Sequence, residues 1–534
     1  MHNGAIKGIL TLFVFALLIN LPYIHLREFQ GEEGRRVIIA QNMIETGDFI
    51  VPHAEGRVYL NKPPLYNWLL AAAFKTAGTV SEASARIPSV IAAFLCAVAL
   101  SLFWRKTTAD TTGIFFLLPG LIFITFSDVM DKAIRAEIDM TFTLFVTLSL
   151  VLWFYYFEVR KKELSAWVFA LFFVGIGALT KGVQSPAFFY CGIIPYLFYK
   201  KKPKKIFSLS HIAGISVLLA VFSVWLVPFA SRVGFGEVLQ AWVSEIVARK
   251  EPLQEGGFLR HFIEFPFQYV IAYLPWIPFL LLWFQKPIKK EPGIIKDLAA
   301  FCVSFLIISL PVYWIVPGAR LRYVMPLSGM LAILISLPVS ALINGKIKET
   351  LGKRYMNVIG CLMIFAVISS AFWGKKYDLF GSVLSVGLLV LLLSLSFLLV
   401  WRKTEISKKI ALFLLVTVFV KILWASFYFP YHAGHRSHYR NAAGQINAMS
   451  PSNVPLCDLG VDNSHLVYYL KRPVLLVDSL DECITKGGSV MFMAADTEEG
   501  MALKGLSYMG KVKARDTMLR LYRCEEDADK DQAN

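Results

Sequence analysis

Four carboxylates stand at the ends of apolar segments of the sequence, where they could act as bases. They are Glu32, Glu33, Glu137 and Asp139. Ionisable groups at a membrane boundary are costly unless they are paired or solvated, so these acids are candidates for proton abstraction from a substrate. The alternative is that they are ordinary loop charges paired with Arg35 and Arg135.

Basic residues on the same predicted side of the membrane form a second set. They are Arg35, Arg36, Lys62, Lys181, Arg232, Arg249, Lys250, Arg260, Arg320 and Arg322. Positive charge on the outer side runs against the usual topology rule, so it predicts an anionic partner, most simply a phosphate. Ion pairs with loop acids and contacts with lipid headgroups are the alternative.

The tripeptide Lys62-Pro63-Pro64 indicates a rigidly held cation. Two prolines fix the backbone and make the residue before them extended, which aims the lysine at the water–lipid boundary. A stiffly held ammonium suits a lipid phosphate. The alternative is an ordinary lysine whose stem lies along the membrane surface.

Three histidines, His432, His435 and His438, have a spacing of three. On one helix they would lie on neighbouring rows, which permits a divalent metal site. A basic surface helix facing headgroups is the favoured alternative. Because no phosphate-cradling glycine loop is present, ATP or NAD chemistry has no support, and the sequence by itself requires no cofactor.

The composition indicates a multi-pass membrane protein. Of the 534 residues, 56% are hydrophobic and 17% are charged, and the mean hydropathy is +0.57. The net charge of +16 comes mostly from short loops between apolar runs. Membrane topology explains that charge without a nucleic-acid partner.

About 13 apolar runs predict transmembrane helices. They cover 6–24, 86–104, 113–130, 139–157, 165–180, 185–199, 207–229, 266–284, 297–316, 323–343, 355–373, 380–401 and 408–428. Alternate loops are basic, which places the N-terminus inside and the C-terminal segment outside. The sequence of the 165–199 region predicts two short helices joined by a tight turn at Gly182.

These patterns predict two domains. Residues 1–428 form an all-α membrane domain with a charged first outer loop at 25–85, and residues 429–534 form a small extracytoplasmic α/β domain ending in a disordered stretch. Two of the three cysteines Cys457, Cys483 and Cys524 could pair there, with the partners left open.

The segment after the first run resembles the polyprenyl-phosphate-dependent membrane glycosyltransferases of GT-C fold, the superfamily of the protein O-mannosyltransferases and of the aminoarabinose transferase that modifies lipid A. The matching residues are Glu32-Glu33-Gly34-Arg35-Arg36, Gly47-Asp48-Phe49 with Pro52, Tyr59 to Trp68, Asp139, Thr180-Lys181-Gly182 and Tyr323. Two departures are Glu32, where the family usually has Asp, and Asn61, where the family often has a metal-binding Glu.

The resemblance implies that a sugar moves with inversion from undecaprenyl phosphate, or a similar lipid phosphate, to an outer acceptor such as lipid A, another glycolipid or a protein. It implies Glu32 as the base, assisted by Asp139 and Glu33. The implied phosphate-binding residues are Lys62, Arg35, Arg249, Tyr323 and Arg320. Pro63, Pro64, Tyr59 and Trp68 would position the site.

The implied protein is a monomer of the bacterial inner membrane with its active site facing outward. Two other functions stay open: a transporter or flippase for an anionic lipid-linked sugar, and a non-catalytic envelope assembly protein. A transporter would place charges near the bilayer midplane, whereas these charges cluster at one boundary.

Overall fold

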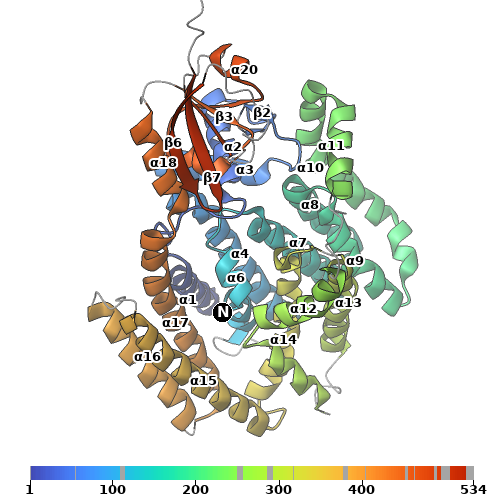
Figure 1. The fold of residues 1–534 in the computed structure, drawn as a ribbon. Coiled ribbons are helices and arrows are strands. Elements are labelled where there is room, and N and C mark those ends of the chain that lie inside the picture. Colours follow the sequence, from blue (N-terminus) through green and yellow to red (C-terminus); the bar gives the residue numbers. More distant parts are fainter. Residues whose placement is uncertain are drawn as a thin grey trace, which may run out of the picture. The chain divides into compact units, whose positions relative to one another are not determined.

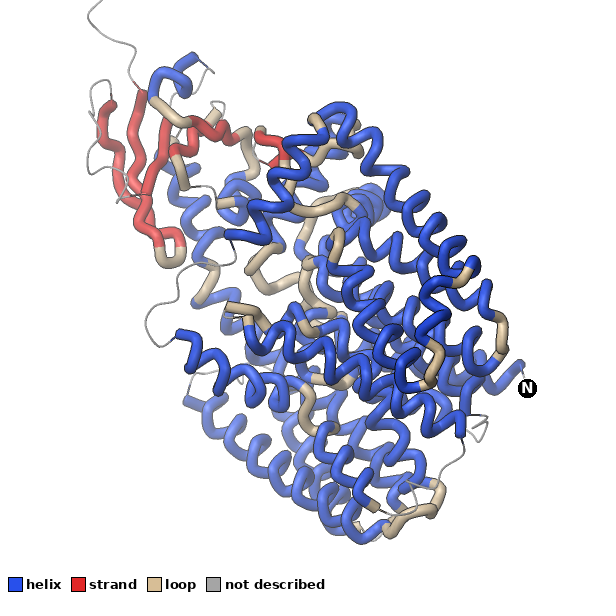
Figure 2. Tube along the Cα trace, turned by 90° about the vertical axis from the view of Figure 1, so that its right-hand side faces the viewer, coloured by secondary structure: helices blue, strands red, loops and turns tan. Residues whose placement is uncertain are grey.

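The computed structural model is mostly helical, with one larger sheet near the C-terminus (Figures 1 and 2). The described residues are 2–54, 56–108, 115–248, 257–285, 293–316, 318–376, 383–402, 404–450, 455–461, 463–485, 490–494 and 506–524. Arg249, Lys250 and the predicted disordered end at 525–534 lie outside them.

The α-helices are α1 (His2–Asn20), α2 (Glu33–Thr46), α3 (Leu65–Ala77), α4 (Glu82–Thr108), α5 (Leu118–Ile124), α6 (Ser127–Lys132), α7 (Ile138–Phe154), α8 (Glu163–Lys181), α9 (Gln184–Tyr199), α10 (Leu209–Val233), α11 (Phe235–Ala248), α12 (Gly257–Ala272), α13 (Gly293–Ile315), α14 (Ser328–Ile343), α15 (Glu349–Lys376), α16 (Val383–Trp401), α17 (Ile406–His435), α18 (His438–Met449), α19 (Ser464–Leu470) and α20 (Leu480–Thr485).

Short turns of other helix types complete the helical part. A π-helix, η2 (Tyr155–Val159), continues α7, and the 3-10 segments are η1 (Phe115–Leu117), η3 (Pro203–Phe207), η4 (Ile277–Phe284), η6 (Leu321–Tyr323) and η7 (Met325–Leu327). The strands are β1 (His53–Ala54), β2 (Arg57–Val58), β3 (Leu456–Leu459), β4 (Val474–Val477), β5 (Val490–Ala494), β6 (Leu506–Ala514) and β7 (Thr517–Cys524).

The chain folds as two compact units. The first unit holds Met1–Ile24, Asn61–Tyr66 and Arg86–Tyr428, and the second holds His25–Leu60, Asn67–Ala85 and Phe429–Asn534. Most of the segment 25–85, which the sequence analysis assigned to the membrane domain, therefore packs with the C-terminal segment.

Within the described residues, eight helical stretches are long and apolar enough to cross a membrane, or nine if the bent pair α12 and η4 counts as one span. The predicted number of 13 crossings stays a prediction. The run at 113–130 is not one helix: it folds as η1, α5 and α6, because Phe126 is extended between α5 and α6. The turn predicted at Gly182 is present between α8 and α9 and has a positive φ of 57°.

Small residues let the helices of the first unit approach closely. α8 packs against α7 and α10, and α14 packs against α5. A Cβ added to Gly214 on α10 would lie 2.9 Å from the carbonyl oxygen of Trp167 on α8. Such close backbone contacts stabilise helix pairs in lipid, where the hydrophobic effect gives no gain between apolar faces.

The second unit contains a five-stranded mixed sheet in the order β4-β3-β5-β7-β6. β3 is parallel to both β4 and β5, whereas β7 is antiparallel to β5 and to β6. Helix α18 packs against β6 and α19. Cys457, Met491, Met493 and Tyr522 are buried together in the core of the sheet. This arrangement is the small α/β sheet domain that the sequence predicted.

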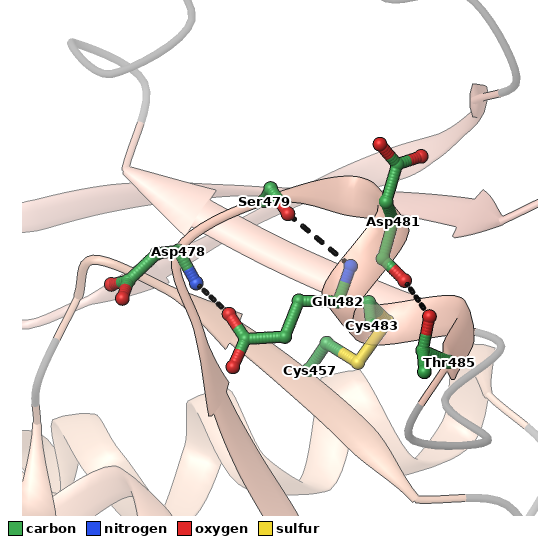
Figure 3. Close-up of a disulfide and its surroundings, with 7 residues drawn as sticks. All are labelled: Cys457, Asp478, Ser479, Asp481, Glu482, Cys483 and Thr485. Carbon is green, nitrogen blue, oxygen red and sulfur yellow. Dashed lines mark hydrogen bonds between the residues drawn. A yellow bond between two sulfur atoms is a disulfide. The ribbon is translucent and has the colours of Figure 1, made fainter.

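A disulfide between Cys457 on β3 and Cys483 on α20 closes a loop with a sequence separation of 26 (Figure 3). The backbone of α20 is fixed locally, because Glu482 N donates to Ser479 Oγ and the Glu482 carboxylate accepts from Asp478 N. Of the pairings that the sequence left open, the structure contains this one.

The close crossing of α4 and α5 gives a stability prediction. A Cβ at Gly120 would lie 2.4 Å from the carbonyl oxygen of Ala97 and 2.4 Å from Ser101 Oγ. We expect Gly120→Ala to lower the free energy of unfolding by about 1–3 kcal/mol, the usual cost of overpacking. Thermal unfolding of the purified chain in detergent measures the change.

The matched control is Gly387→Ala on α16, where an added Cβ meets nothing within 4 Å. Removing this exposed helical glycine should leave stability unchanged or raise it by up to about 1 kcal/mol. Equal melting temperatures for the two variants would contradict the close crossing.

Candidate active site

A buried ion pair lies at one end of α7 in the first unit. Lys181 Nζ donates to Asp139 Oδ1 at 2.6 Å, and the two side chains are only 5% and 4% exposed. The Lys181 ammonium also lies 5.0 Å from the ring centroid of Phe142 and 5.8 Å from that of Tyr323. Asp139 thus has a fixed cationic partner inside the protein.

The local fold explains why these two residues meet. Asp139 is in the first turn of α7, and Lys181 is the last residue of α8, which packs along α7. The positive end of one helix dipole favours the carboxylate, and the negative end of the other favours the ammonium. Gly182 then ends α8 with a left-handed φ.

Glu137 adds a second buried carboxylate beside this pair. Its two oxygens lie 3.3 Å from Lys132 Nζ and 3.7 Å from Arg322 Nη1. Arg135, the partner considered from the sequence, instead makes a bidentate pair with Asp131. The end of α7 therefore carries two buried carboxylates, each beside at least one cation.

Arg322 is tied electrostatically to both acids. Burial lowers the pKa of Arg322, but the carboxylates of Asp139 and Glu137 outweigh burial and hold the pKa above its usual value. The guanidinium lies 5.5 Å from the ring centroid of Tyr323. Arg322 and Tyr323 are thus placed near the Asp139–Lys181 pair.

Asp128 on α6 is a further acid, which the sequence did not single out. Its Oδ2 is buried and has no hydrogen-bond partner among the described residues. Nothing in the sequence distinguished this aspartate, because its burial comes from helices distant along the chain.

The Lys-Pro-Pro segment is linked to the end of α7. Pro63 and Pro64 are buried, and Lys62 Nζ donates to the Asn61 carbonyl at 3.2 Å. Tyr66 shares a 2.9 Å hydrogen bond with Ser89, whose hydroxyl donates to the Glu137 carbonyl at 3.4 Å. Two hydrogen bonds therefore join this segment to the backbone just before Asp139. Arg320, by contrast, is exposed.

The acid pair Glu32 and Glu33 lies in the second unit, and its members differ in environment. Glu32 caps α2 and is one-third exposed, with its carboxylate 3.8 Å from Arg35 Nη1 and 4.0 Å from Arg36 Nη2. Glu33 is fully buried, and its carboxylate accepts from Gln30 N at 2.9 Å. Only Glu32 is open to solvent.

Two predicted positioning residues hold this segment. The Arg36 guanidinium donates to the Tyr59 hydroxyl at 3.1 Å and lies over its ring. Trp68 Nε1 donates to the carbonyl of Phe49 at 2.8 Å. Helix α2 itself ends at Gly47, whose φ is 73°.

Arg440 on α18 anchors the chain just before the acid pair. Its side chain pairs with Glu82 and donates to the Leu26 carbonyl, and its backbone N–H donates to Glu28 at 2.6 Å. Tyr469 donates to Glu82 and accepts from Phe29 N. Burial raises the pKa of Glu28 to about 7, against the hydrogen bond from Arg440.

The histidine triplet does not form the helical array that would favour a metal. Helix α17 ends at His435 and α18 begins at His438, so the three residues do not share one helix. His432 is buried and bonded to the Gln30 amide, and His435 Nδ1 contacts its own helix at Tyr431. Across the part of the chain that is described, no group of three metal-ligating side chains is found.

The predicted site residues therefore fall into two groups, each described within its own unit. Asp139, Lys62, Tyr323 and Arg320 belong to the first unit, whereas Glu32, Glu33, Arg35, Tyr59 and Trp68 belong to the second. The acid–base cluster at the end of α7 includes Lys181 and Arg322, to which the sequence assigned no particular role in the site.

Part of the chain is similar to a known protein family, and most of it is similar to a protein of another organism. Residues 61–227 match the family model for dolichyl-phosphate-mannose-protein mannosyltransferase. An uncharacterized protein of Aquifex aeolicus is 26% identical over 475 residues, which cover 88% of this chain and 86% of that protein.

Relatives whose names state an activity match this chain over shorter lengths. An undecaprenyl phosphate-alpha-4-amino-4-deoxy-L-arabinose arabinosyl transferase of Pseudomonas savastanoi pv. phaseolicola is 28% identical over 226 residues, 42% of each chain. The protein of that name in Yersinia enterocolitica is 24% identical over 344 residues, 62% of this chain and 59% of the relative. The matches thus span less than two thirds of either arabinosyl transferase.

The fold has close counterparts among solved structures. The crystal structure of ArnT from Cupriavidus metallidurans bound to undecaprenyl phosphate has a TM-score of 0.72 over 98% of both chains, at 15% identity. The apo structure of the same protein has a TM-score of 0.71 over 97% of both chains, at 16% identity.

The fold therefore defines a multi-pass membrane protein of the GT-C class. Over residues 61–227 by sequence, and over nearly the whole chain by fold, the protein is similar to the superfamily of the aminoarabinose transferases and protein mannosyltransferases. The resemblance drawn from residues 32–68 is confirmed at this level.

The Asp139–Lys181 pair gives a second prediction. Lys181→Met leaves a buried carboxylate without its main counter-charge, so we expect a loss of about 3–5 kcal/mol in the free energy of unfolding. The double variant Asp139→Asn/Lys181→Met should lose much less than the two single variants combined. Thermal unfolding in detergent measures all three.

Lys408→Met serves as the control, because the Lys408–Glu405 pair is about 70% exposed on both sides. An exposed pair contributes about 1 kcal/mol or less. If Lys181→Met were as mild as this control, the buried pair would have little influence on stability.

Proposed function

We propose that the protein transfers a sugar from a polyprenyl-phosphate donor, such as an undecaprenyl-phosphate sugar, to an acceptor outside the cytoplasm. The observation that carries the proposal is the acid–base cluster around Asp139, Lys181, Arg322 and Tyr323, joined by hydrogen bonds to the Lys62-Pro63-Pro64 segment. The names of similar proteins include undecaprenyl phosphate, which supports a polyprenyl-phosphate donor.

The chemical requirement is to stabilise a phosphate leaving group. As the bond between the anomeric carbon and the phosphate oxygen breaks, its electron pair stays on the phosphate and adds negative charge. Fixed cations aimed at that charge lower the barrier without an acid. In this proposal Lys62, Arg35, Arg320 and Arg249 supply that charge, and the Tyr323 hydroxyl donates a hydrogen bond.

The acceptor needs a base to take its proton. In this proposal Glu32 accepts the proton of the acceptor hydroxyl while the acceptor oxygen bonds to the anomeric carbon from the opposite face. The configuration at that carbon inverts, and the proton later leaves Glu32 for water. The exposure of Glu32 supports this role, because a base must reach the proton it abstracts.

The other two acids take different roles. Asp139, held by Lys181, positions the acceptor or shares its proton. Glu33 holds the turn before α2 through its bond to Gln30 N, rather than acting as a base. The step requires no cofactor, since a carboxylate moves the proton and fixed cations balance the charge.

The acceptor class is a hydroxyl or phosphate of lipid A, another glycolipid or a protein. We place the enzyme, as a monomer, in the bacterial inner membrane with its N-terminus inside and its active site outside. The disulfide between Cys457 and Cys483 supports an outer location for the C-terminal segment, because such bonds persist in oxidising compartments.

The catalytic assignment is tested with Glu32→Gln and Asp139→Asn. Membranes containing each variant receive labelled undecaprenyl-phosphate aminoarabinose, and the release of undecaprenyl phosphate is measured. We expect Glu32→Gln to lower the rate about 100-fold or more, as for loss of a general base, and Asp139→Asn to lower it as well.

Glu45→Gln is the control, since Glu45 is exposed near the end of the same helix. It should transfer at the wild-type rate. Full transfer by both Glu32→Gln and Asp139→Asn would reject the assignment, whereas absence of any transfer by the wild type would reject this donor.

The topology is tested with single cysteines in a background whose unpaired cysteines are replaced by serine. Asp516→Cys lies in the exposed turn between β6 and β7, and Lys408→Cys lies in the exposed first turn of α17. A membrane-impermeant maleimide should label position 516 in intact spheroplasts. Position 408 should be labelled only after permeabilisation, and the reverse pattern would invert the topology.

A further inference from the structure

His465, in the second unit, packs against the helix that carries the acid pair. It is the second residue of α19, and α19 packs along α2. A Cβ added to Gly34 on α2 would lie 2.9 Å from His465 N and 3.0 Å from both its Cα and its ring Cδ2. The histidine therefore contacts the backbone of α2 directly after Glu32 and Glu33.

The position of the His465 ring is fixed from two other directions. The ring stacks on Tyr439 of α18, with 5.1 Å between the centroids and 13° between the planes. The Asn463 side chain accepts from the N–H groups of His465 and Leu466, which fixes the start of α19. The imidazole is thus rigidly held beside the first turn of α2.

One ring nitrogen has no assigned partner. His465 Nε2 is buried and makes no hydrogen bond within the described residues. A buried polar atom without a partner is costly, and in a native protein it calls for a functional or structural reason. An ordinary packing role does not require a titratable ring at this position.

Charged groups face the ring from two elements. Glu32, Glu33 and Arg35 face it from α2, and Arg515 faces it from the turn between β6 and β7. On α18 its neighbour is the phenol of Tyr439. Burial lowers the pKa of His465, and the two glutamates only partly oppose that shift, so the ring is neutral at pH 7.

We propose that His465 is a positioning residue for Glu32: the neutral ring supports the first turn of α2 and so holds the Glu32 carboxylate in place, whereas the protonated ring attracts the acid pair, displaces that carboxylate and stops transfer. The proposal rests on the proposed function, because it assumes that Glu32 is the base. In acid, the ring takes its proton from water, and no other reactant is needed.

The test is the pH dependence of kcat/KM for His465→Gln, in membranes, with labelled undecaprenyl-phosphate aminoarabinose. In the wild type, activity requires an ionised Glu32 and a neutral His465, so the acid limb should fall about 100-fold per pH unit. Glutamine cannot be protonated in this range. In the variant, kcat/KM should therefore fall only about tenfold per pH unit on the acid side.

A second measurement does not depend on activity. Since the folded-state pKa of His465 is depressed, its contribution to stability is present above its unfolded pKa and is lost as the pH falls through and below that value. The melting temperature of the wild-type chain in detergent should fall more between pH 7 and pH 5 than that of His465→Gln. His438→Gln, an exposed histidine of the same unit, should behave as the wild type.

The outcomes separate the two proposals. If the wild type transfers sugar and the acid limbs of the wild type and His465→Gln coincide, the role of His465 is rejected while the proposed function stands. If the wild type transfers nothing at any pH, the aminoarabinose donor is rejected, and an equal pH dependence of the melting temperatures of the wild type and His465→Gln would still reject the role of His465. A uniform loss of activity at all pH values would also reject the positioning role, since it indicates packing alone.

Discussion

The first unit depends on one constraint: two buried charges at the ends of packed helices must neutralise each other. Asp139 at the start of α7 and Lys181 at the end of α8 are almost fully buried and lie 2.6 Å apart. Leaving either charge alone inside the protein would cost several kcal/mol. The helix pair that satisfies this constraint also brings Arg322 and Tyr323 beside a second carboxylate, Glu137. The side chains that stabilise this helix pair are thus also those of the proposed active site.

In the second unit, buried charged side chains are also paired, here through hydrogen bonds distributed over many residues. Arg440 joins α18 to Glu82 and Glu28, and so holds the chain that leads to Glu32. The disulfide between Cys457 on β3 and Cys483 connects α20 to the sheet. In the proposed function Glu32 is the base, which must be held in position yet remain reachable; its one-third exposure beside two arginines is compatible with both conditions.

Much of the helical structure could be predicted from local signals. Apolar runs of membrane length, the stop at Gly47 and the turn at Gly182 all depend on near neighbours in the chain. The prediction was wrong at 113–130, where an extended residue breaks the run, and at the histidine triplet, where a break separates two helices. The long strand β6 was also not identified, because its alternation is interrupted at Gly510 by an irregular register with β7.

The sequence by itself determined the membrane class, the resemblance to the GT-C transferases and the candidate side chains of the site, because hydropathy and short motifs are local properties. Only the tertiary structure decided which charges pair, namely Asp139 with Lys181 and Arg135 with Asp131. It also decided that Cys457 forms a disulfide with Cys483. It also placed His465 against Gly34, more than 400 residues earlier in the chain. Such contacts depend on which helix faces meet, and burial then sets the electrostatic environment of each group, which no local pattern encodes.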